Sequence, residues 1–257
     1  MLFDIAVDIS KLSFFVACAY ALLGAYARRS RPQWTKYLTK RRMAVLAILT
    51  LAVVAVKLIE DVVAKESGPV DEAILWFIRD HVPSAMNAFF TAITFSGSAR
   101  FLVPVAVVAV VILLVYRRRF EALLLVVSGT TAMLLVWGLK TIVARARPEL
   151  WNSQWYWGSS FPSGHTLSTA AFSTAAALCV ARIWPRAGSL AMALAVSWTS
   201  LVAISRLVLG VHWPSDVLAA LCLGAFIPLL ISMANDLLPH GARSTGRPKG
   251  TTVKPCR

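Results

Sequence analysis

The sequence predicts an all-α protein built as a polytopic bundle of transmembrane helices, and two observations carry this prediction. Of its 257 residues, 58% are hydrophobic and only 15% are charged, whereas a soluble domain carries about 25% charged residues. The apolar residues also fall into runs long enough to cross a hydrocarbon layer, which takes roughly 20 residues per helix. The low charge excludes a disordered chain, and the spacing of the four cysteines excludes a disulfide scaffold or a zinc site.

Six apolar runs are expected to form the core spans. They cover about residues 43–64, 101–116, 121–139, 166–184, 189–209 and 215–237. A shorter run, Leu12 to Ala27, precedes them and is expected to add an N-terminal span; the alternative is a segment lying in the membrane interface. We therefore divide the chain into an apolar segment and basic loop (1–42), a membrane core (43–238) and a basic cytoplasmic tail (239–257).

Residues 71–100, between the first two core runs, mix aromatic and charged side chains and are too polar as a whole to span. This mixture favours one or two short amphipathic helices resting on the outer membrane interface, broken near Pro83 because proline interrupts a helix. A plain connector is the alternative.

The formal net charge of +14 follows a pattern of membrane orientation rather than of nucleic-acid binding. Its basic clusters lie at residues 28–42, at 117–119, at Arg182 and Arg186, and after Leu238. With an N-terminal span, all of these clusters, 17 of the 26 Lys and Arg residues, fall on one side of the membrane. The positive-inside rule makes that side cytoplasmic. We expect a bacterial inner-membrane protein with no nucleic-acid partner and with its N-terminus outside, since the acidic first residues do not resemble a signal peptide.

Three polar clusters interrupt the apolar pattern at the mouths of the predicted helices. They are Lys140 to Pro148, Phe161 to His165, and Ser205 to Asp216. The alternation of spans places all three at the outer face. Ionisable groups at membrane depth are costly, so such a convergence indicates a functional site.

The residue types in these clusters suit the chemistry of a phosphate. Arginine binds phosphate oxygens in pairs and lysine adds a point charge, while the start of a helix at Ser163 and Gly164 offers backbone N–H groups to an anion. Asp216, four residues after His212, could hold one ring nitrogen and leave the other free to attack phosphorus. His165 could then act as the general acid. Each residue alone also fits a structural role, such as anchoring a helix end at the headgroups.

The motifs Lys140-x6-Arg147-Pro148, Pro162-Ser163-Gly164-His165 and Ser205-Arg206-x5-His212-x3-Asp216 resemble the full tripartite signature of the type-2 phosphatidic acid phosphatase superfamily. The resemblance implies that His212 is the nucleophile that forms a phosphohistidine, that Asp216 orients it and that His165 protonates the leaving oxygen. It further implies that the transferring phosphoryl group is held by Lys140, Arg147, Ser163, Gly164 and Arg206. Members of that family work without a metal or another cofactor. Arg145 lies outside the signature; it could make an accessory phosphate contact, and the alternative is that it anchors the helix end at the headgroups.

A site at the outer water–lipid boundary favours a lipid phosphate as substrate. We expect hydrolysis of undecaprenyl pyrophosphate to undecaprenyl phosphate, with a phosphatidylglycerophosphate or phosphatidate phosphatase, or a lipid phosphotransferase, as alternatives. The three Trp and one Tyr within residues 151–157 could line a lateral entry for the lipid chain or form a simple interfacial belt. A transporter or a non-catalytic scaffold is the alternative from another class: Lys57 and Asp61 could belong to an ion pathway, or form a local ion pair. The sequence sets no oligomeric state.

Overall fold

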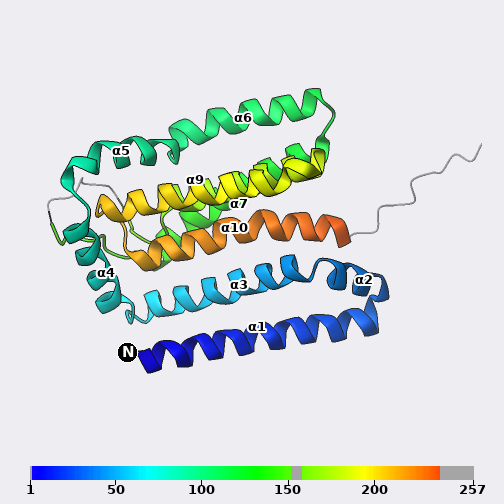
Figure 1. Cartoon of the computed structure of the whole chain (residues 1–257), viewed down its shortest axis with the longest axis horizontal. Coiled ribbons are helices and arrows are strands. Elements are labelled where there is room, and N and C mark those ends of the chain that lie inside the picture. Colours follow the sequence, from blue (N-terminus) through cyan, green and yellow to red (C-terminus); the bar gives the residue numbers. More distant parts are fainter. Residues whose placement is uncertain (1, 152–157, 238–257) are drawn as a thin grey trace, which may run out of the picture.

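The computed structural model describes residues 2–151 and 158–237, with side chains from residue 7 onward. All regular elements in this part of the chain are helices, which agrees with the predicted all-α fold, and the long ones lie side by side along one direction (Figure 1). The α-helices are α1 (Leu2–Ser30), α2 (Pro32–Lys40), α3 (Arg42–Val63), α4 (Gly68–His81), α5 (Asn87–Ser96), α6 (Ala99–Val115), α7 (Arg119–Val143), α8 (Gly164–Ile183), α9 (Gly188–Val208) and α10 (Pro214–Leu237). Two short 3₁₀ turns, η1 (Ser84–Met86) and η2 (Pro185–Ala187), precede α5 and α9.

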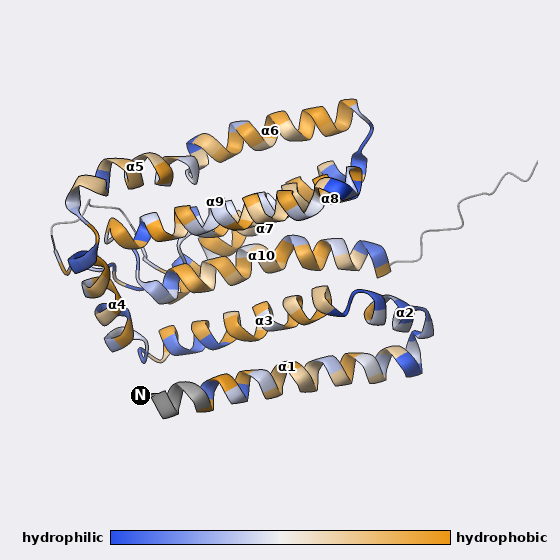
Figure 2. Ribbon diagram, viewed as in Figure 1, coloured by the Kyte–Doolittle hydropathy of each residue, from blue (hydrophilic) through white to orange (hydrophobic). Residues whose placement is uncertain are grey.

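Six helices of the described residues are long and apolar enough to cross a membrane. They cover Val7–Ser30, Arg42–Val63, Arg119–Val143, Gly164–Ile183, Pro185–Val208 and Pro214–Leu237. The hydrophobic residues run along these helices and the hydrophilic ones gather toward their ends (Figure 2). The N-terminal segment is thus longer than the run from Leu12 to Ala27. Because α1 lies antiparallel beside α3, it has the arrangement of a span rather than of an interfacial helix (Figure 1).

The segment between α3 and α6 breaks near Pro83 as predicted, but its two helices differ in placement. Helix α4 lies across one end of the bundle (Figure 1). Helix α5 instead packs against α9 and meets α6 at an angle of 41°, so that the pair has the length and hydropathy of one broken span. Of the one or two interfacial helices expected here, only α4 lies at the end of the bundle, where an interfacial helix would lie; α5 runs along the bundle beside α9 (Figure 1). Residues 71–100 are polar as a whole because α4 is charged, although α5 by itself is apolar.

Glycine and alanine residues let the central helices approach closely. Gly224 of α10 faces α8 so tightly that a Cβ atom there would lie 2.6 Å from Ala170 Cβ and 2.6 Å from the Leu167 carbonyl oxygen. The core cluster around this contact contains Leu167, Ala171 and Ala220, all without exposed surface. Small residues at helix interfaces are the usual means of packing in membranes, where lipid removes the hydrophobic drive between helices. This contact brings the N-terminal ends of α8 and α10 together.

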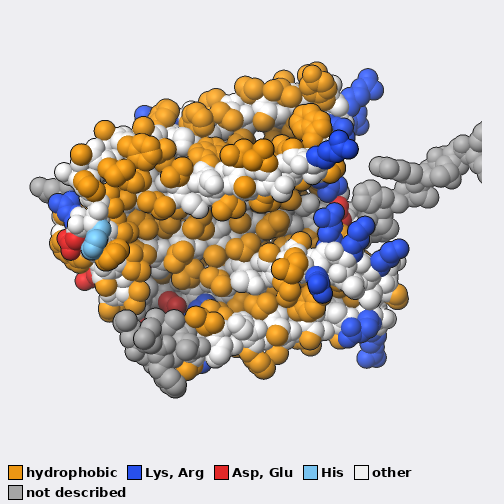
Figure 3. All heavy atoms as spheres, viewed as in Figure 1, with side chains coloured by type: hydrophobic (Ala, Val, Ile, Leu, Met, Phe, Trp, Pro, Cys, Tyr) orange, Lys and Arg blue, Asp and Glu red, His pale blue; other side chains and the backbone are white. Residues whose placement is uncertain are grey.

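The basic clusters and the three polar motifs lie at opposite ends of the bundle. Lys and Arg side chains gather at the end where α2 lies (Figure 3). The motifs lie at the other end, beside α4, where α7 and α9 finish and α8 and α10 begin (Figure 1). This is the partition that the alternation of spans predicted. The predicted cytoplasmic tail, 239–257, lies outside the described residues.

We expect Gly224→Ala to destabilise the protein, because the added methyl group meets the backbone of α8. Overpacking of this kind costs about 1–3 kcal/mol. Gly129→Ala in α7 is the matched control, because its Cβ meets no atom within 4 Å. Thermal unfolding in detergent should show a lower midpoint for Gly224→Ala and an unchanged or higher one for Gly129→Ala; equal midpoints would contradict the close packing of α8 on α10.

Candidate active site

Four helix ends and the loops that join them hold the three motifs. Helix α7 ends at Val143, and the left-handed φ of 46° at its C-cap residue, Ala144, redirects the chain into the segment that carries Arg145 and Arg147. The chain leaves α9 through Gly210, which has a φ of 65° and lies against the ring of Trp151, at a distance that leaves no room for a Cβ atom. His212 follows in this short loop, immediately before α10. The site is therefore built from loop backbone fixed by two left-handed residues.

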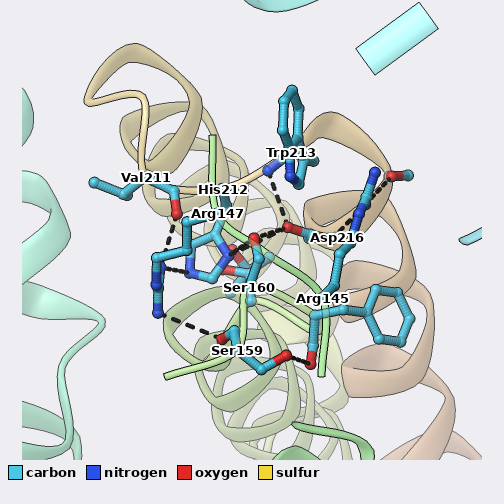
Figure 4. A network of polar contacts seen from close by, with 12 residues as sticks. Arg145, Arg147, Ser159, Ser160, Val211, His212, Trp213 and Asp216 are labelled. Atoms are coloured by element: carbon cyan, nitrogen blue, oxygen red, sulfur yellow. Dashed lines mark hydrogen bonds and ion pairs between the residues drawn. The ribbon is translucent and has the colours of Figure 1, made fainter. Parts of the chain in front are cut away.

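Asp216 occupies the third position of α10 and has no exposed surface. Its Oδ2 accepts a hydrogen bond from the backbone N–H of Trp213 at 2.9 Å, which is how an acidic residue in the first turn closes a helix N-terminus. Ser160 donates its hydroxyl to the same oxygen. The Nδ1 atom of His212 lies 3.5 Å from Oδ2 (Figure 4). The predicted pairing of His212 with Asp216 is thus present in the structure.

His212 is buried, and its other ring nitrogen faces a cation. The Nε2 atom lies 3.4 Å from Nη1 of Arg147, which also donates to the Val211 carbonyl oxygen at 2.7 Å (Figure 4). Burial lowers the pKa of His212 from 6.5 to about 4, and the nearby charges of Arg206 and Arg147 lower it as well, against the opposing effect of Asp216. A neutral ring whose Nδ1–H points to the carboxylate keeps a lone pair on Nε2. This is the form that a nucleophile requires.

The remaining predicted site residues surround the same point. Lys140 donates to the backbone carbonyl of Ser159, and the side chain of Arg206, 1% exposed, donates to Thr94 Oγ1 of α5 at 2.6 Å. Ser163 is buried, Gly164 begins α8, and His165 follows it. His165 lies within electrostatic range of Lys140, Arg147, Arg206 and His212. The structure thus gathers cations, two histidines and a helix N-terminus in one place, where they could hold and attack a phosphoryl group.

Four residues of the site were not found from the sequence or make contacts that differ from the roles considered for them. Neither role considered for Arg145, an accessory phosphate contact or a headgroup anchor, includes the ion pairs that its guanidinium forms with two carboxylates, 2.7 Å from Asp216 Oδ1 and 2.7 Å from Asp71 Oδ2. Asp71 of α4 and Ser160 were not singled out, because neither belongs to a motif; only the fold brings Asp71 to Arg145 and Ser160 to Asp216. Thr94 was missed for the same reason.

Other residues that the sequence analysis considered lie outside this site. Lys57 pairs with Asp61 at 2.7 Å, one helical turn along α3, as a local ion pair would. Residues 152–157 of the aromatic connector lie outside the described residues, although Trp151 itself packs 5.6 Å from the ring of Trp76 of α4. No group of three or more His, Cys, Asp or Glu among the described residues is placed to hold a metal ion.

We expect His212 to stay neutral as the pH is lowered to about 4, because burial opposes its protonation. Nuclear magnetic resonance of protein carrying isotope-labelled histidine, with His212→Ala to assign the signal, measures this directly. Folding stability should fall as the pH drops from 6.5 toward 4, since the unfolded chain binds the proton first. A midpoint near 6.5 for His212 in the folded protein would contradict the buried, neutral ring.

The chain is similar to known membrane phosphatases. Residues 121–236 match the model of the PAP2 superfamily. Phosphatidylglycerophosphatase B of Bacillus subtilis strain 168 is 31% identical over 149 residues, which are 57% of this chain and 73% of that protein. Phosphatidylglycerophosphatase B of Escherichia coli K12 is 41% identical over 75 residues, 28% of each chain. YbjG of the same strain, named as an undecaprenyl-diphosphatase, is 50% identical over 66 residues, 25% of this chain and 29% of that one.

The fold agrees with these matches. The crystal structure of a transmembrane PAP2-type phosphatidylglycerolphosphate phosphatase from Bacillus subtilis superposes with a TM-score of 0.69 at 26% identity, covering 76% of this chain and 98% of that one. The first curated relatives, by contrast, are matched over only 28% of their length. The long match to the Bacillus subtilis relative, the tripartite motif and the shared fold together show that this chain belongs to the PAP2 superfamily.

Proposed function

We propose that this protein is a lipid phosphate phosphatase that works through a phosphohistidine on His212. The observation that carries the proposal is the buried His212 ring, whose Nδ1 faces Asp216 and whose Nε2 faces Arg147. A histidine held in this way has its tautomer fixed and its second nitrogen directed at the place where cations would hold a phosphate.

The reaction follows from these positions. His212 Nε2 attacks phosphorus, the bond between phosphorus and the leaving oxygen breaks, and His165 gives that oxygen its proton. Asp216 stabilises the positive charge that the imidazole gains. Water then attacks phosphorus and the P–N bond to His212 breaks, which returns the electron pair to Nε2. His165, neutral after the first step, takes the proton of the water, and inorganic phosphate leaves. Lys140, Arg147 and Arg206, with the N-terminus of α8 at Ser163 and Gly164, would offset the charge on the phosphoryl oxygens.

A phosphate attached to a lipid fits a site at the end of a bundle of span-length helices. Undecaprenyl pyrophosphate is our first candidate, and the similarity to YbjG of Escherichia coli supports it. Phosphatidylglycerophosphate is the second, because the longest of these matches is to a phosphatidylglycerophosphatase. A lipid phosphotransferase would use the same residues, with an acceptor lipid in place of water.

We further propose that the site faces the outside of the cytoplasmic membrane of a bacterium. The separation of the basic clusters from the site supports this orientation, because loops rich in Lys and Arg stay on the cytoplasmic side. The substrate would then be a lipid phosphate of the outer leaflet.

We expect the purified protein to release phosphate from undecaprenyl pyrophosphate, phosphatidylglycerophosphate or phosphatidate in the presence of EDTA. His212→Ala should abolish release, and His81→Ala, an exposed histidine of α4, should not. Quenching in alkaline detergent with a substrate carrying ³²P in the transferred phosphoryl group should trap label on the wild-type protein but not on His212→Ala, because a phosphohistidine is stable in base and hydrolyses in acid. The rates of phosphate release rank the substrates.

Loss of all release with EDTA, or full release by His212→Ala, would overturn the proposed mechanism. A transporter or a scaffold would be indifferent to His212→Ala. Transfer of the label to an added lipid, with no free phosphate, would establish the phosphotransferase instead.

Orientation is tested with single cysteines in a variant that lacks the four native ones. Asp80→Cys, exposed on α4 at the end of the bundle opposite the basic clusters, should react with a membrane-impermeant maleimide on intact spheroplasts. Tyr116→Cys, 75% exposed at the basic end, should react only after lysis. The reverse pattern would place the site in the cytoplasm.

A further inference from the structure

A second carboxylate reaches the site from α4, outside the tripartite motif. Asp71 lies in the first turn of that helix and is only 2% exposed. Its Oδ1 accepts the backbone N–H of Ser215 at 2.8 Å, and its Oδ2 accepts the Ser215 hydroxyl at 2.5 Å. Asp71 thereby joins α4, which lies across the end of the bundle, to the first turn of α10 at Ser215, the residue before Asp216.

Arg145 bridges the two carboxylates. Its Nη1 donates to Asp216 Oδ1 at 2.7 Å and to the Ser215 hydroxyl at 2.8 Å. Its Nη2 donates to Asp71 Oδ2 at 2.7 Å and to the Ser67 hydroxyl at 3.1 Å. The guanidinium also lies over the ring of Trp213, 5.4 Å from its centre. Nη1 of the guanidinium therefore binds Asp216, and Nη2 binds Asp71.

This division decides which oxygen of Asp216 faces His212. A guanidinium alone with a carboxylate tends to bind both oxygens with its two N–H groups. Here Asp71 occupies Nη2, so Arg145 reaches Asp216 through Oδ1 only. Oδ2 is then left to Ser160, to the Trp213 N–H and to His212 Nδ1.

We propose that Asp71 and Arg145 are positioning residues that keep Asp216 oriented toward His212, an inference that rests on the proposed phosphohistidine mechanism. Asp71 restrains Arg145, and Arg145 holds Oδ1 of Asp216, so that Oδ2 supports the imidazole while it carries the phosphoryl group. Neither residue needs to touch the substrate.

The test compares Asp71→Asn with Asp80→Asn, an exposed acid on the same helix. Asparagine keeps the shape of Asp71 but removes the charge that restrains Arg145. We expect kcat to fall about 10–100-fold, the size of the loss seen when the residue that orients a metal-binding side chain is removed. KM and the inhibition constant of inorganic phosphate should change less than about threefold, because the cations that would bind phosphate are untouched. Asp80→Asn should match the wild type, and Asp71→Glu should recover part of kcat.

A double-mutant cycle separates this electrostatic bridge from simple loss of packing. Arg145→Gln leaves two buried carboxylates without the cation between them, so it should cost more kcat than Asp71→Asn. The double variant Asp71→Asn/Arg145→Gln removes one of those charges and should lose less than the product of the two single losses. Strict multiplication of the two effects would overturn the bridge.

Isotope-labelled histidine gives a readout that does not depend on turnover. The ¹⁵N signals of His212 should report protonation at Nδ1 in the wild type and in Asp80→Asn, and a mixture of tautomers in Asp71→Asn. An unchanged His212 spectrum in folded Asp71→Asn, or a full kcat, would overturn the inference, as would a loss of activity that only follows a loss of folded protein. If the wild type hydrolyses none of the lipids, the proposed function fails by itself, and the His212 spectra still decide whether Asp71 orients the pair.

Discussion

The structure of this protein depends on a negative charge held where no water reaches it. Asp216 has no exposed surface, and a buried carboxylate is stable only when donors and a cation surround it. Its donors come from separate parts of the chain: Ser160 from the loop before α8, Arg145 from the segment after α7, and the backbone of Trp213 from the loop after α9. Meeting the needs of one carboxylate therefore fixes two loops, the one between α7 and α8 at both of its ends and the one between α9 and α10. The first of these loops also carries Arg147, which would hold a phosphate.

The helices beneath make this convergence possible. Helices α8 and α10 approach closely at Gly224, which sets their N-terminal ends side by side. Helix α5 packs against α9 and brings Thr94 to Arg206, while α4 brings Asp71 to Arg145. The ends of span-length helices thus enclose a polar site at one end of the bundle. Helix α4 lies across this end of the bundle. Its buried Asp71 contacts the site, whereas its Trp76 and Phe77 are exposed.

The sequence was informative where its signals are local or chemical. Apolar runs predict helices of span length because the hydrocarbon thickness sets that length. Segments of mixed polarity are harder to place from sequence. Residues 71–100 contain both the charged α4 and the apolar α5, so their overall polarity does not reveal that α5 packs along α9. The motif residues Lys140, Arg147 and His212 stood out because such groups are rare beside apolar runs.

By itself, the sequence determined the all-α class, the runs that become long helices, the side of the bundle on which the motifs gather, and the residues of the tripartite motif. These follow from hydropathy, from the alternation of spans and from the spacing of chemically distinctive residues. The tertiary structure alone decided that Arg145 binds two carboxylates, that one of them is Asp71 of α4, and that Ser160 reaches Asp216. Those contacts join residues more than 50 positions apart, and their partners are chosen by how the helices pack, which no local pattern encodes.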